Sequence, residues 1–481
     1  MKKLFSLSLA LFSAAVISAC TSDDSSSNAG DPPSSSSMDP VMEELSINYQ
    51  MLDLCYIYAH TIDNLAPSVK DYVGKGTAKD AVNANSGEDQ CTKEYYDVCY
   101  MYDKLKDPFT HYYDPTLASA VIAELMEPEE EYVILGIDYV ITEISEEDVT
   151  CEVTYVSDEM KEQDVRVGDK FSLGLLSLTM DETKDTSDAM LVAMRGEDAA
   201  TVTVKVTMAK QPTVAIHYEK TEGGDSIPVI RIREFDQKTV GAGGTREEFA
   251  EALKKTKDSK SVIIDLRNNG GGDTDHCNAT SAEFLSKGDT ITIDIEADAD
   301  SVVEDGETKY VQKLDTNVVV TDKDGSAKDR YVVMLADDLS ASCAELMLSA
   351  IASNKKAPIV GKLTYGKQIG QWVIYTGDKV EDDDEYPDFA KNLKGLAIVT
   401  ALYAYDKDWK QFQDVGIVPD YEIEGAQAQM KKAVELAAKG TEKRIAGYGT
   451  ERLGHFAKTA ATGNYKASIK DLKRSRYKIV R

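Results

Sequence analysis

Three things are scarce in this sequence: cysteine, basic side chains and long apolar runs. The 481 residues include 7 cysteines, too few for a fold held together mainly by disulfide bonds. Lys and Arg number 54 against 84 Asp and Glu, a formal net charge of −30. A surface of this sign repels phosphate backbones, so nucleic acid is not an expected partner. After the first twenty residues no apolar run is long enough to span a bilayer.

The remaining composition is that of a globular protein. Hydrophobic residues make up 42% and charged residues 29% of the chain. This balance excludes a fibrous repeat, a wholly disordered chain and a multi-spanning membrane protein. At roughly 150 residues per domain, the length predicts two or three domains. The patterns along the chain predict an α+β multidomain fold.

The first twenty residues have the three-part layout of an export signal. Lys2 and Lys3 are followed by an apolar stretch over residues 4–17 and then by small residues before Cys20. One interpretation is an ordinary signal cleaved near Ala19. The segment resembles a bacterial lipoprotein signal more closely, which implies removal of residues 1–19 and lipidation of Cys20.

The segment behind this cysteine supports a membrane tether. Residues 20–40 are rich in serine and contain almost nothing apolar, so we expect a flexible spacer. The membrane would then be a partner through the lipid anchor, and the protein would lie in the bacterial cell envelope. By analogy with lipoprotein sorting, Thr21 favours the outer membrane, on its periplasmic face or at the cell surface.

Residues 41–126 repeat apolar side chains at helical spacing and contain many tyrosines. This pattern predicts a helical N-terminal region. Export permits disulfide bonds, and one pair is expected among Cys55, Cys91 and Cys99. The sequence does not choose the pair.

Short β-rich runs over residues 131–210 predict a small β domain. A helix expected over residues 187–194 and a closing strand follow in the order of a PDZ domain, which this region resembles. Such a domain binds an extended peptide at a sheet edge and holds its terminal carboxylate with backbone amides. The resemblance implies a carboxylate-binding turn made of Leu135, Gly136, Ile137 and Asp138. A generic small β domain is the alternative.

Strands and helices alternate through residues 211–425, which predicts an α/β core built from β-α-β units. Sites in such cores lie where strands end and helices begin. Within this core we interpret residues 286–330 as a strand-rich elaboration without an assigned role. Residues 426–481 are expected to form a helix and a basic tail, which is solvated, docked on the protein or in contact with anionic lipid or polymer.

One serine of the core stands between a predicted buried strand and a predicted helix. Ser342 would lie at the helix N-terminus, beside free amides that favour developing negative charge. Serine is also a preferred N-cap residue, so a structural role is the alternative. Two further segments shift the balance towards catalysis: the glycine-rich turn DLRNNGGG at 265–272, and residues 361–371, which contain Lys367 and Gln371.

Together these segments resemble the carboxy-terminal processing peptidases, or tail-specific proteases. Members of this family use a Ser–Lys dyad, with the nucleophile three residues before a glutamate, as Ser342 precedes Glu345. Their lysine lies in a Tyr-Gly-Lys segment with a glutamine four residues on, as Lys367 and Gln371 do. Two further stretches resemble family segments, at residues 104–115 (KLKDPFTHYYDP) and 400–423. The resemblance covers residues ~41–440 and is specific in its joint spacing.

The chemistry of these residues is coherent. A serine hydroxyl needs a positioned base, and lysine serves as one only if burial lowers its pKa. Gln371 would orient Lys367. The resemblance implies an oxyanion hole made of the backbone amides of Cys343 and Gly271, and it implies neither cofactor nor metal.

The match has departures and rivals. Gly270 stands where the family often has proline, and Cys343 where alanine is common. A Cys343 nucleophile and a Ser-His-Asp triad are alternatives. Another rival is a metal site, but the spacing of its possible ligands fits no common zinc pattern, which favours a solvated polar loop. These residues are Asp273, Asp275, His276 and Cys277.

The sequence thus predicts an envelope-anchored serine endopeptidase that cleaves proteins near their C-termini through an acyl-enzyme. The PDZ-like domain would capture substrates, which are proteins or peptides with accessible C-termini. The alternative is a catalytically inactive lipoprotein that binds peptides or protein C-termini through the same domain.

Overall fold

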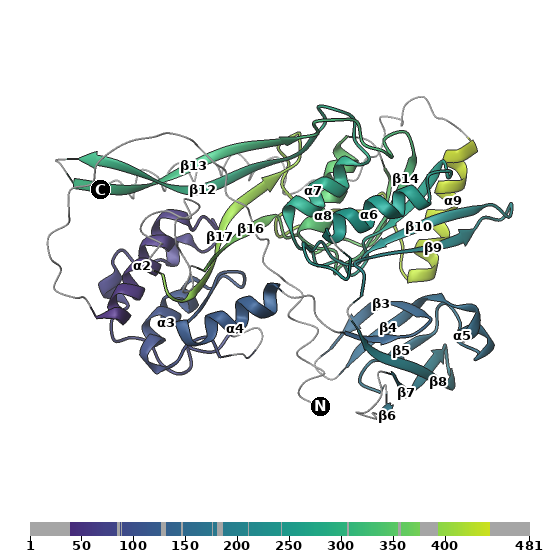
Figure 1. Ribbon diagram of the computed structural model, residues 1–481, viewed down its shortest axis with the longest axis horizontal. Coiled ribbons are helices and arrows are strands. Elements are labelled where there is room, and N and C mark those ends of the chain that lie inside the picture. Colours follow the sequence, from purple (N-terminus) through teal and green to yellow (C-terminus); the bar gives the residue numbers. More distant parts are fainter. Residues whose placement is uncertain are drawn as a thin grey trace.

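The computed structural model describes residues 39–442 apart from short internal gaps. The gaps are residues 84–86, 88, 127–130, 146–147, 176, 180–185, 210, 242, 305–306, 355–356 and 376–392. The predicted signal, Cys20, most of the spacer and the basic tail lie outside the described residues. Figure 1 shows a helical lobe, an α/β core and a β lobe, with a long hairpin reaching from the core over the helical lobe.

The helical lobe is built from α2, α3 and α4, all within the stretch where the sequence predicts a helical region. Asp39 caps the first helix by accepting a hydrogen bond from the Val41 amide (3.0 Å), and Pro40 occupies its first turn. The three helices span Pro40–Cys55, Tyr96–Leu105 and Pro115–Met126. Short 3-10 turns cover Ile62–Asn64, Val69–Asp71 and Lys93–Tyr95. A short strand, β1 (His111–Tyr113), leads from α3 to α4.

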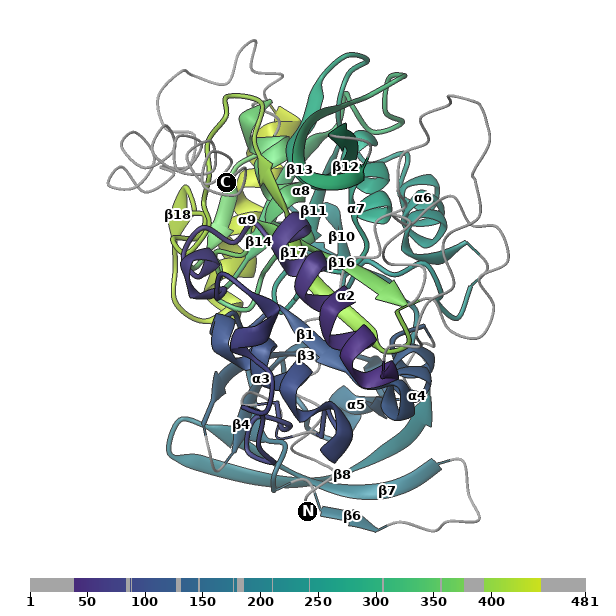
Figure 2. The same ribbon diagram turned by 90° about the vertical axis from the view of Figure 1, so that its left-hand side faces the viewer.

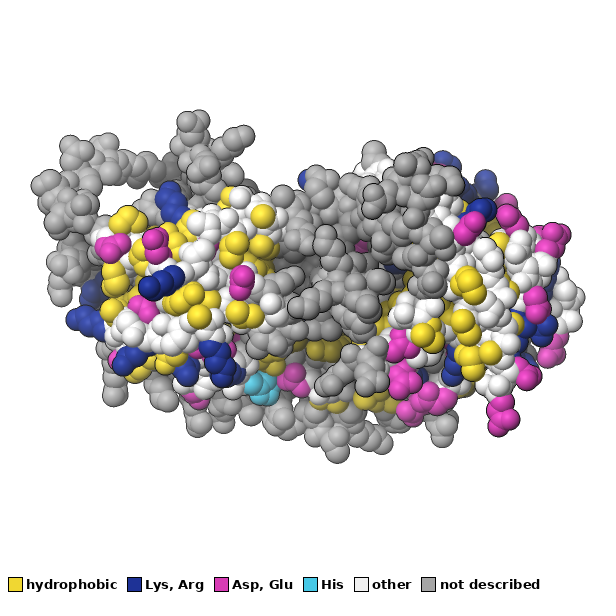
Figure 3. Space-filling model, turned by 90° about the horizontal axis from the view of Figure 1, so that it is seen from below, with side chains coloured by type: hydrophobic (Ala, Val, Ile, Leu, Met, Phe, Trp, Pro, Cys, Tyr) yellow, Lys and Arg dark blue, Asp and Glu magenta, His cyan; other side chains and the backbone are white. Residues whose placement is uncertain are grey.

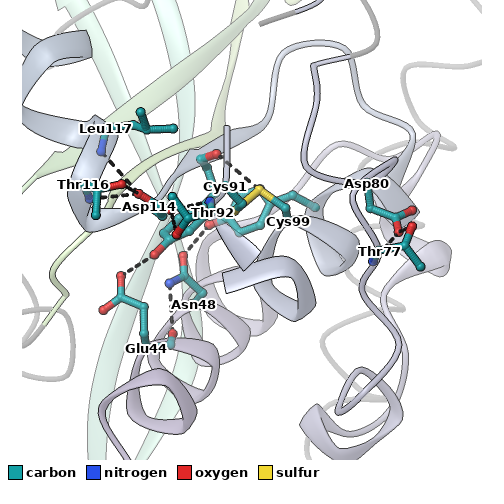
Figure 4. The surroundings of a disulfide bond; sticks show 12 residues. Glu44, Asn48, Thr77, Asp80, Cys91, Thr92, Cys99, Asp114, Thr116 and Leu117 are labelled. Atoms are coloured by element: carbon teal, nitrogen blue, oxygen red, sulfur yellow. Dashed lines mark hydrogen bonds between the residues drawn. A yellow bond between two sulfur atoms is a disulfide. The ribbon is translucent and has the colours of Figure 1, made fainter. Parts of the chain in front are cut away.

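A disulfide bond fastens this lobe. It joins Cys91 and Cys99, whose Cα atoms lie 6.2 Å apart, while Cys55 is buried with a free thiol. Figure 4 shows the bond beside Asp114, a buried carboxylate that accepts hydrogen bonds from Thr92 and Thr116. The structure thus selects one of the three pairings that the sequence left open.

The β lobe is an antiparallel sheet with the order β2-β8-β7-β5-β4-β3, and β6 pairs with β7. Its strands are β2 (Glu131–Ile134), β3 (Ile137–Ile144), β4 (Val149–Val156), β5 (Lys170–Ser172), β6 (Ser177–Thr179), β7 (Thr186–Arg195) and β8 (Asp198–Ala209). The short helix α5 (Asp158–Glu162) follows β4. Among the described residues of this lobe, α5 is the only helix.

The helix expected over residues 187–194 is wrong, because this segment is strand β7. Ser187, Ala189, Leu191 and Ala193 are buried and alternate with more exposed neighbours, which is the period of a strand. Alanine, leucine and methionine favour helices, but full-length pairing with β8 overrides that preference. The PDZ domain is therefore not confirmed, since the helix that would form one wall of its groove is absent from the described residues.

The core sheet has the order β18-β15-β14-β11-β10-β9, parallel except for the antiparallel edge strand β9. The β-α-β prediction holds in this part of the chain, where α6, α7 and α8 cover one face and α9 the other (Figure 1). Its strands are β9 (Val214–Lys220), β10 (Ser226–Ile232), β11 (Ser261–Asp265), β14 (Tyr331–Ala336), β15 (Ile359–Gly361) and β18 (Tyr421–Glu422). Its helices are α6 (Gly244–Lys255), α7 (Thr274–Ala282), α8 (Cys343–Ser353) and α9 (Ala426–Glu442).

A third, antiparallel sheet connects the core to the helical lobe. Its order is β1-β17-β12-β13, and β16 also pairs with β17. The strands contributed by the core are β12 (Thr290–Glu304), β13 (Glu307–Val320), β16 (Ile369–Tyr375) and β17 (Leu396–Tyr405). Helix α2 lies across β17 and β12, as Figure 2 shows. The stretch expected to be a strand-rich elaboration is thus the β12–β13 hairpin.

Figure 3 views the molecule from below, where acidic side chains gather on the right-hand lobe, that of the β2–β8 sheet. Within residues 39–442, gaps excepted, no helix has the length and apolar character that crossing a bilayer requires.

Candidate active site

Ser342 lies in the turn between β14 and α8, one residue before the helix begins. Its φ of 53° and ψ of −120° are rare for a residue with a side chain. An N-cap residue ordinarily has an extended backbone, so a capping role alone does not account for this conformation. Backbone strain of this kind concentrates at functional sites, and a strand–turn–helix elbow presents a nucleophile in other hydrolases.

The neighbouring Ser340 has a structural role. Its side chain is buried, and its hydroxyl donates to the Leu266 carbonyl oxygen over 2.8 Å. This bond fixes the serine turn on the end of strand β11. Of the two serines in this turn, Ser342 is therefore the candidate nucleophile.

Glu345, buried on the first turn of α8, ties the serine turn to the lysine loop. Its Oε2 accepts hydrogen bonds from the amides of Ser342 (3.0 Å) and Lys367 (2.8 Å). Its Oε1 accepts from the Gly366 amide (2.7 Å) and the Thr364 hydroxyl. Burial raises the pKa of Glu345 to about 7, against the effect of these donors. The backbones of the serine and the lysine thus share one carboxylate oxygen.

The Lys367 side chain is 3% exposed, and this desolvation lowers its pKa to about 8. Its Nζ lies 5.0 Å from the centre of the Phe109 ring. The carboxylates of Asp107 and Glu345 favour the charged form but are outweighed by burial. No hydrogen bond between Lys367 Nζ and Ser342 Oγ is present in the described part of the chain. Such bonds often tighten only when substrate binds.

Gln371 is buried on β16, directly opposite Thr400 of β17. Its Nε2 donates to the Thr400 hydroxyl over 3.3 Å, and that hydroxyl donates to Asp107 Oδ2 over 2.9 Å. Asp107 and Thr400 were missed by the sequence reasoning. The available signal was the stretch 104–115, in which Asp107 opens the Asp-Pro-Phe-Thr turn.

Gly271 lies directly against the serine turn. A Cβ added to it would lie 2.7 Å from Ser342 Cβ and 3.1 Å from the Cys343 amide nitrogen. Its φ of 113° also requires glycine. The Gly271 amide donates to Asn269 Oδ1 over 2.8 Å, whereas the Cys343 amide has no partner among the described residues. Of the two predicted oxyanion donors, Cys343 is thus the one free to bind an oxyanion.

The Cys343 side chain itself points away from the site. Its thiol is buried and donates to the Asp273 carbonyl oxygen over 3.4 Å. This placement argues against a cysteine nucleophile at position 343, because the sulfur lies in the apolar core between α7 and α8.

Asp337 connects the serine turn to the glycine-rich loop. Its Oδ1 accepts from the amides of Asn268 (2.9 Å) and Leu339 (3.1 Å), and its Oδ2 accepts from Asn268 Nδ2 (2.6 Å). Burial raises the pKa of Asp337 to about 6. The Asn268 Nδ2 also donates to the Ile141 carbonyl oxygen of β3 (3.1 Å), so this loop is in contact with the β lobe.

The turn predicted to bind a carboxylate, Leu135 to Asp138, lies between β2 and the start of β3. The Leu135 amide donates to the Lys205 carbonyl oxygen over 2.8 Å. Asp138 forms an ion pair with Arg231 at 2.5 Å, and this pairing holds the pKa of Asp138 below its usual range against the effect of burial. This aspartate therefore joins the β lobe to the core.

The predicted metal-ligand types at 273–277 form a capped helix instead of a solvated loop. Asp273 caps α7 by accepting from the His276 amide (2.9 Å), and His276 Nδ1 accepts from the Arg246 amide (3.2 Å). Within the described residues no group of three or more such side chains is placed to hold a metal ion.

The sequence of this chain is similar to those of known peptidases. Residues 226–423 match peptidase family S41. A probable CtpA-like serine protease of Staphylococcus haemolyticus (strain JCSC1435) is 29% identical over 198 residues, 38% of this chain and 35% of that protein. The corresponding protein of Staphylococcus aureus (strain bovine RF122 / ET3-1) is 29% identical over 250 residues, 49% of this chain and 43% of that protein. The chain thus spans less than half the length of these curated relatives.

Two solved structures align with most of this chain. A photosystem II D1 C-terminal processing protease gives a TM-score of 0.45 at 15% identity, covering 81% of this chain and 94% of that one. A putative S41 protease from Bacteroides fragilis NCTC 9343 gives 0.48 at 12% identity, covering 82% and 97%. The sequence match contains the serine turn, the lysine loop and the glycine-rich loop: residues 226–423 of this chain match peptidase family S41 and are similar to CtpA-like serine proteases, in agreement with the resemblance to carboxy-terminal processing peptidases.

Proposed function

We propose that this protein is a serine endopeptidase that cleaves proteins near their C-termini, with Ser342 as nucleophile and Lys367 as base. The observation that carries the proposal is the shared contact of both residues with Glu345. The Glu345 carboxylate holds a serine with a strained backbone and a desolvated lysine on adjoining loops. Ser342 is also the N-cap of α8, and Glu345 completes its capping box. A cap requires neither a strained backbone nor a buried lysine, whereas an activated nucleophile uses both.

The reaction follows from these positions. Neutral Lys367 takes the proton of Ser342 Oγ as this oxygen attacks the substrate carbonyl carbon. The negative oxygen that forms accepts a hydrogen bond from the Cys343 amide, a contact typically worth roughly 3–4 kcal/mol in the transition state. The peptide bond breaks, and the leaving amine takes the proton from Lys367. The Lys367 amine, neutral again, then takes a proton from a water molecule as that water attacks the acyl-serine. It returns this proton to Ser342 Oγ as the acyl–oxygen bond breaks.

The proposal is tested by replacing each member of the dyad. Ser342→Ala and Lys367→Ala are expected to lower the turnover of casein, or of a substrate with an accessible C-terminus, by more than about 1,000-fold. Thermal melts of both variants should stay near that of the wild type. Full activity in either variant would refute the dyad, and inactivity of the wild type would favour the alternative, a non-catalytic lipoprotein that binds peptides.

Capture of substrate C-termini by the β lobe is part of the proposal. Its support is the antiparallel sheet with β3 at one edge. Core side chains already bind that edge at Ile141, through Asn268, and at Tyr139, through Arg231, so an added peptide would pair with the other residues of β3. An extended peptide is recognised by addition to such an edge. Within the described residues of this lobe no helix forms a second wall, so a sheet edge rather than a two-walled groove is the element proposed to bind the peptide.

Envelope anchoring completes the proposal. Its support is the sequence of residues 1–20, which resembles a bacterial lipoprotein signal, followed by the serine-rich segment 20–40. A lipid on Cys20 would tether the peptidase to the envelope, most consistent with the outer membrane. Its substrates would then be envelope proteins whose C-termini reach this surface.

A further inference from the structure

The N-terminal lobe contributes one buried carboxylate to the hydrogen-bond network that contains Gln371. Asp107 is 6% exposed, and it lies in the loop that leads from α3 to β1. It accepts hydrogen bonds from the Phe109 amide (2.9 Å), the Thr110 hydroxyl (2.6 Å) and the Thr400 hydroxyl (2.9 Å). The Tyr56 hydroxyl is also within hydrogen-bonding reach. A carboxylate bound by so many donors has a fixed position.

The sheet topology connects this carboxylate to Gln371 through Thr400. Strand β17 pairs with β1 on one side and with β16 on the other. Thr400 on β17 therefore contacts Asp107 from the β1 side and Gln371 from the β16 side. The loop that carries Asp107 also carries Phe109, whose ring lies 5.0 Å from Lys367 Nζ.

We propose that Asp107 is a positioning residue for the base: through Thr400 it holds Gln371, and it places a negative charge beside the Lys367 amine. This inference rests on the proposed function, in which Lys367 takes the serine proton. A family S41 core would then depend on its N-terminal lobe for chemistry as well as for packing.

The electrostatics around the amine are consistent with this role. The groups that act on the charge of Lys367 are the Glu345 carboxylate on α8, the Asp107 carboxylate on the N-terminal lobe and the buried Cys343 thiol, which contributes only when it is ionised. Glu345 already binds four donors and cannot be changed without moving the serine turn. Asp107 is the carboxylate that can be neutralised while the serine turn keeps its contacts.

The test compares the pH dependence of kcat/KM for full-length wild type and Asp107→Asn. Removing the negative charge disfavours the ammonium form, so the acid midpoint should move to lower pH by about 0.5–1 pH unit. The value of kcat on the plateau should fall about tenfold, because Gln371 loses its support. An unchanged midpoint would overturn the inference.

Asp114→Asn is the matched control. Asp114 is a fully buried carboxylate of the same lobe, bound by the amides and hydroxyls of Thr92 and Thr116, and it is not among the charges that act on Lys367. It should lower the melting temperature about as much as Asp107→Asn does and leave the acid midpoint in place. An equal shift of the midpoint in both variants would show a general effect of a weakened lobe and overturn the inference.

A second pair of variants covers the case in which Asp107→Asn does not fold. Thr400→Val removes the bridging hydroxyl at constant shape, and Thr400→Ser retains it. The expected result is a kcat about tenfold lower in the valine variant, restored by serine, with KM unchanged in both. Equal kcat in the two variants would overturn the inference. Retained activity in Lys367→Ala would instead overturn the proposed function.

Discussion

At the scale of single residues, burial converts one lysine into a possible base. The pKa of Lys367 falls to about 8 because its amine is desolvated, so the neutral form becomes abundant as the pH rises through that value. We expect kcat/KM to rise about tenfold per pH unit below about pH 8 and to level off above it. A pH–rate profile with a peptide substrate measures this, and a profile flat between pH 6 and pH 9 would contradict a lysine base.

Glu345 gives a second prediction at this scale. Glu345→Gln should lower kcat about 100-fold and destabilise the fold by about 2–3 kcal/mol. The reason is that an amide group cannot accept from all four donors that the carboxylate binds. Activity assays and urea unfolding measure the two effects. Gln371→Glu and Ser340→Ala leave the Glu345 carboxylate intact and serve as comparisons. A wild-type kcat in Glu345→Gln would show that the contacts of Glu345 with the Ser342 and Lys367 amides do not position the dyad.

At the scale of elements, the helical lobe depends on a short covalent link as well as on packing. The disulfide joins Cys91, in the segment before α3, to Cys99 within that helix. Replacing both cysteines by alanine should destabilise this lobe by about 2–3 kcal/mol, since a short loop regains its freedom in the unfolded chain. Reductant should lower the melting temperature of the wild type. The same reductant should leave the double variant unchanged, and equal sensitivity of the two proteins would be evidence against the bond.

Element boundaries were predictable where one face of an element decides its period. The sequence predicts buried strands over residues 262–264 and 331–335 and a helix over residues 344–353. Strands β11 and β14 and helix α8 lie close to these ranges, because continuous apolar runs bounded by turns have few other solutions. The segment 187–194 was not predictable in this way. Its residues suit a helix, and only pairing with β8 makes it a strand.

At the scale of the whole molecule, three sheets bring distant segments to one site, and a lipid is proposed to bring that site to a membrane. Changing Cys20→Ser should abolish incorporation of labelled palmitate and release the protein into the soluble fraction of cells. The reason is that acyl chains, rather than a helix, would supply the membrane affinity. Cys55→Ser is a control that retains Cys20. Undiminished labelling of the Cys20→Ser variant would show that another residue carries the lipid and would contradict lipidation at Cys20.

The sequence alone predicted the alternating strands and helices of the core, because local periodicity encodes them, and the resemblance of short motifs to a known family supplied the serine, lysine and glutamine of the proposed site. Tertiary structure decided which cysteines pair, that segment 187–194 is a strand and that Asp107 reaches the same network as Gln371. These outcomes depend on contacts between residues far apart in the chain. One sequence without its fold specifies which groups exist but not which of them share a hydrogen bond.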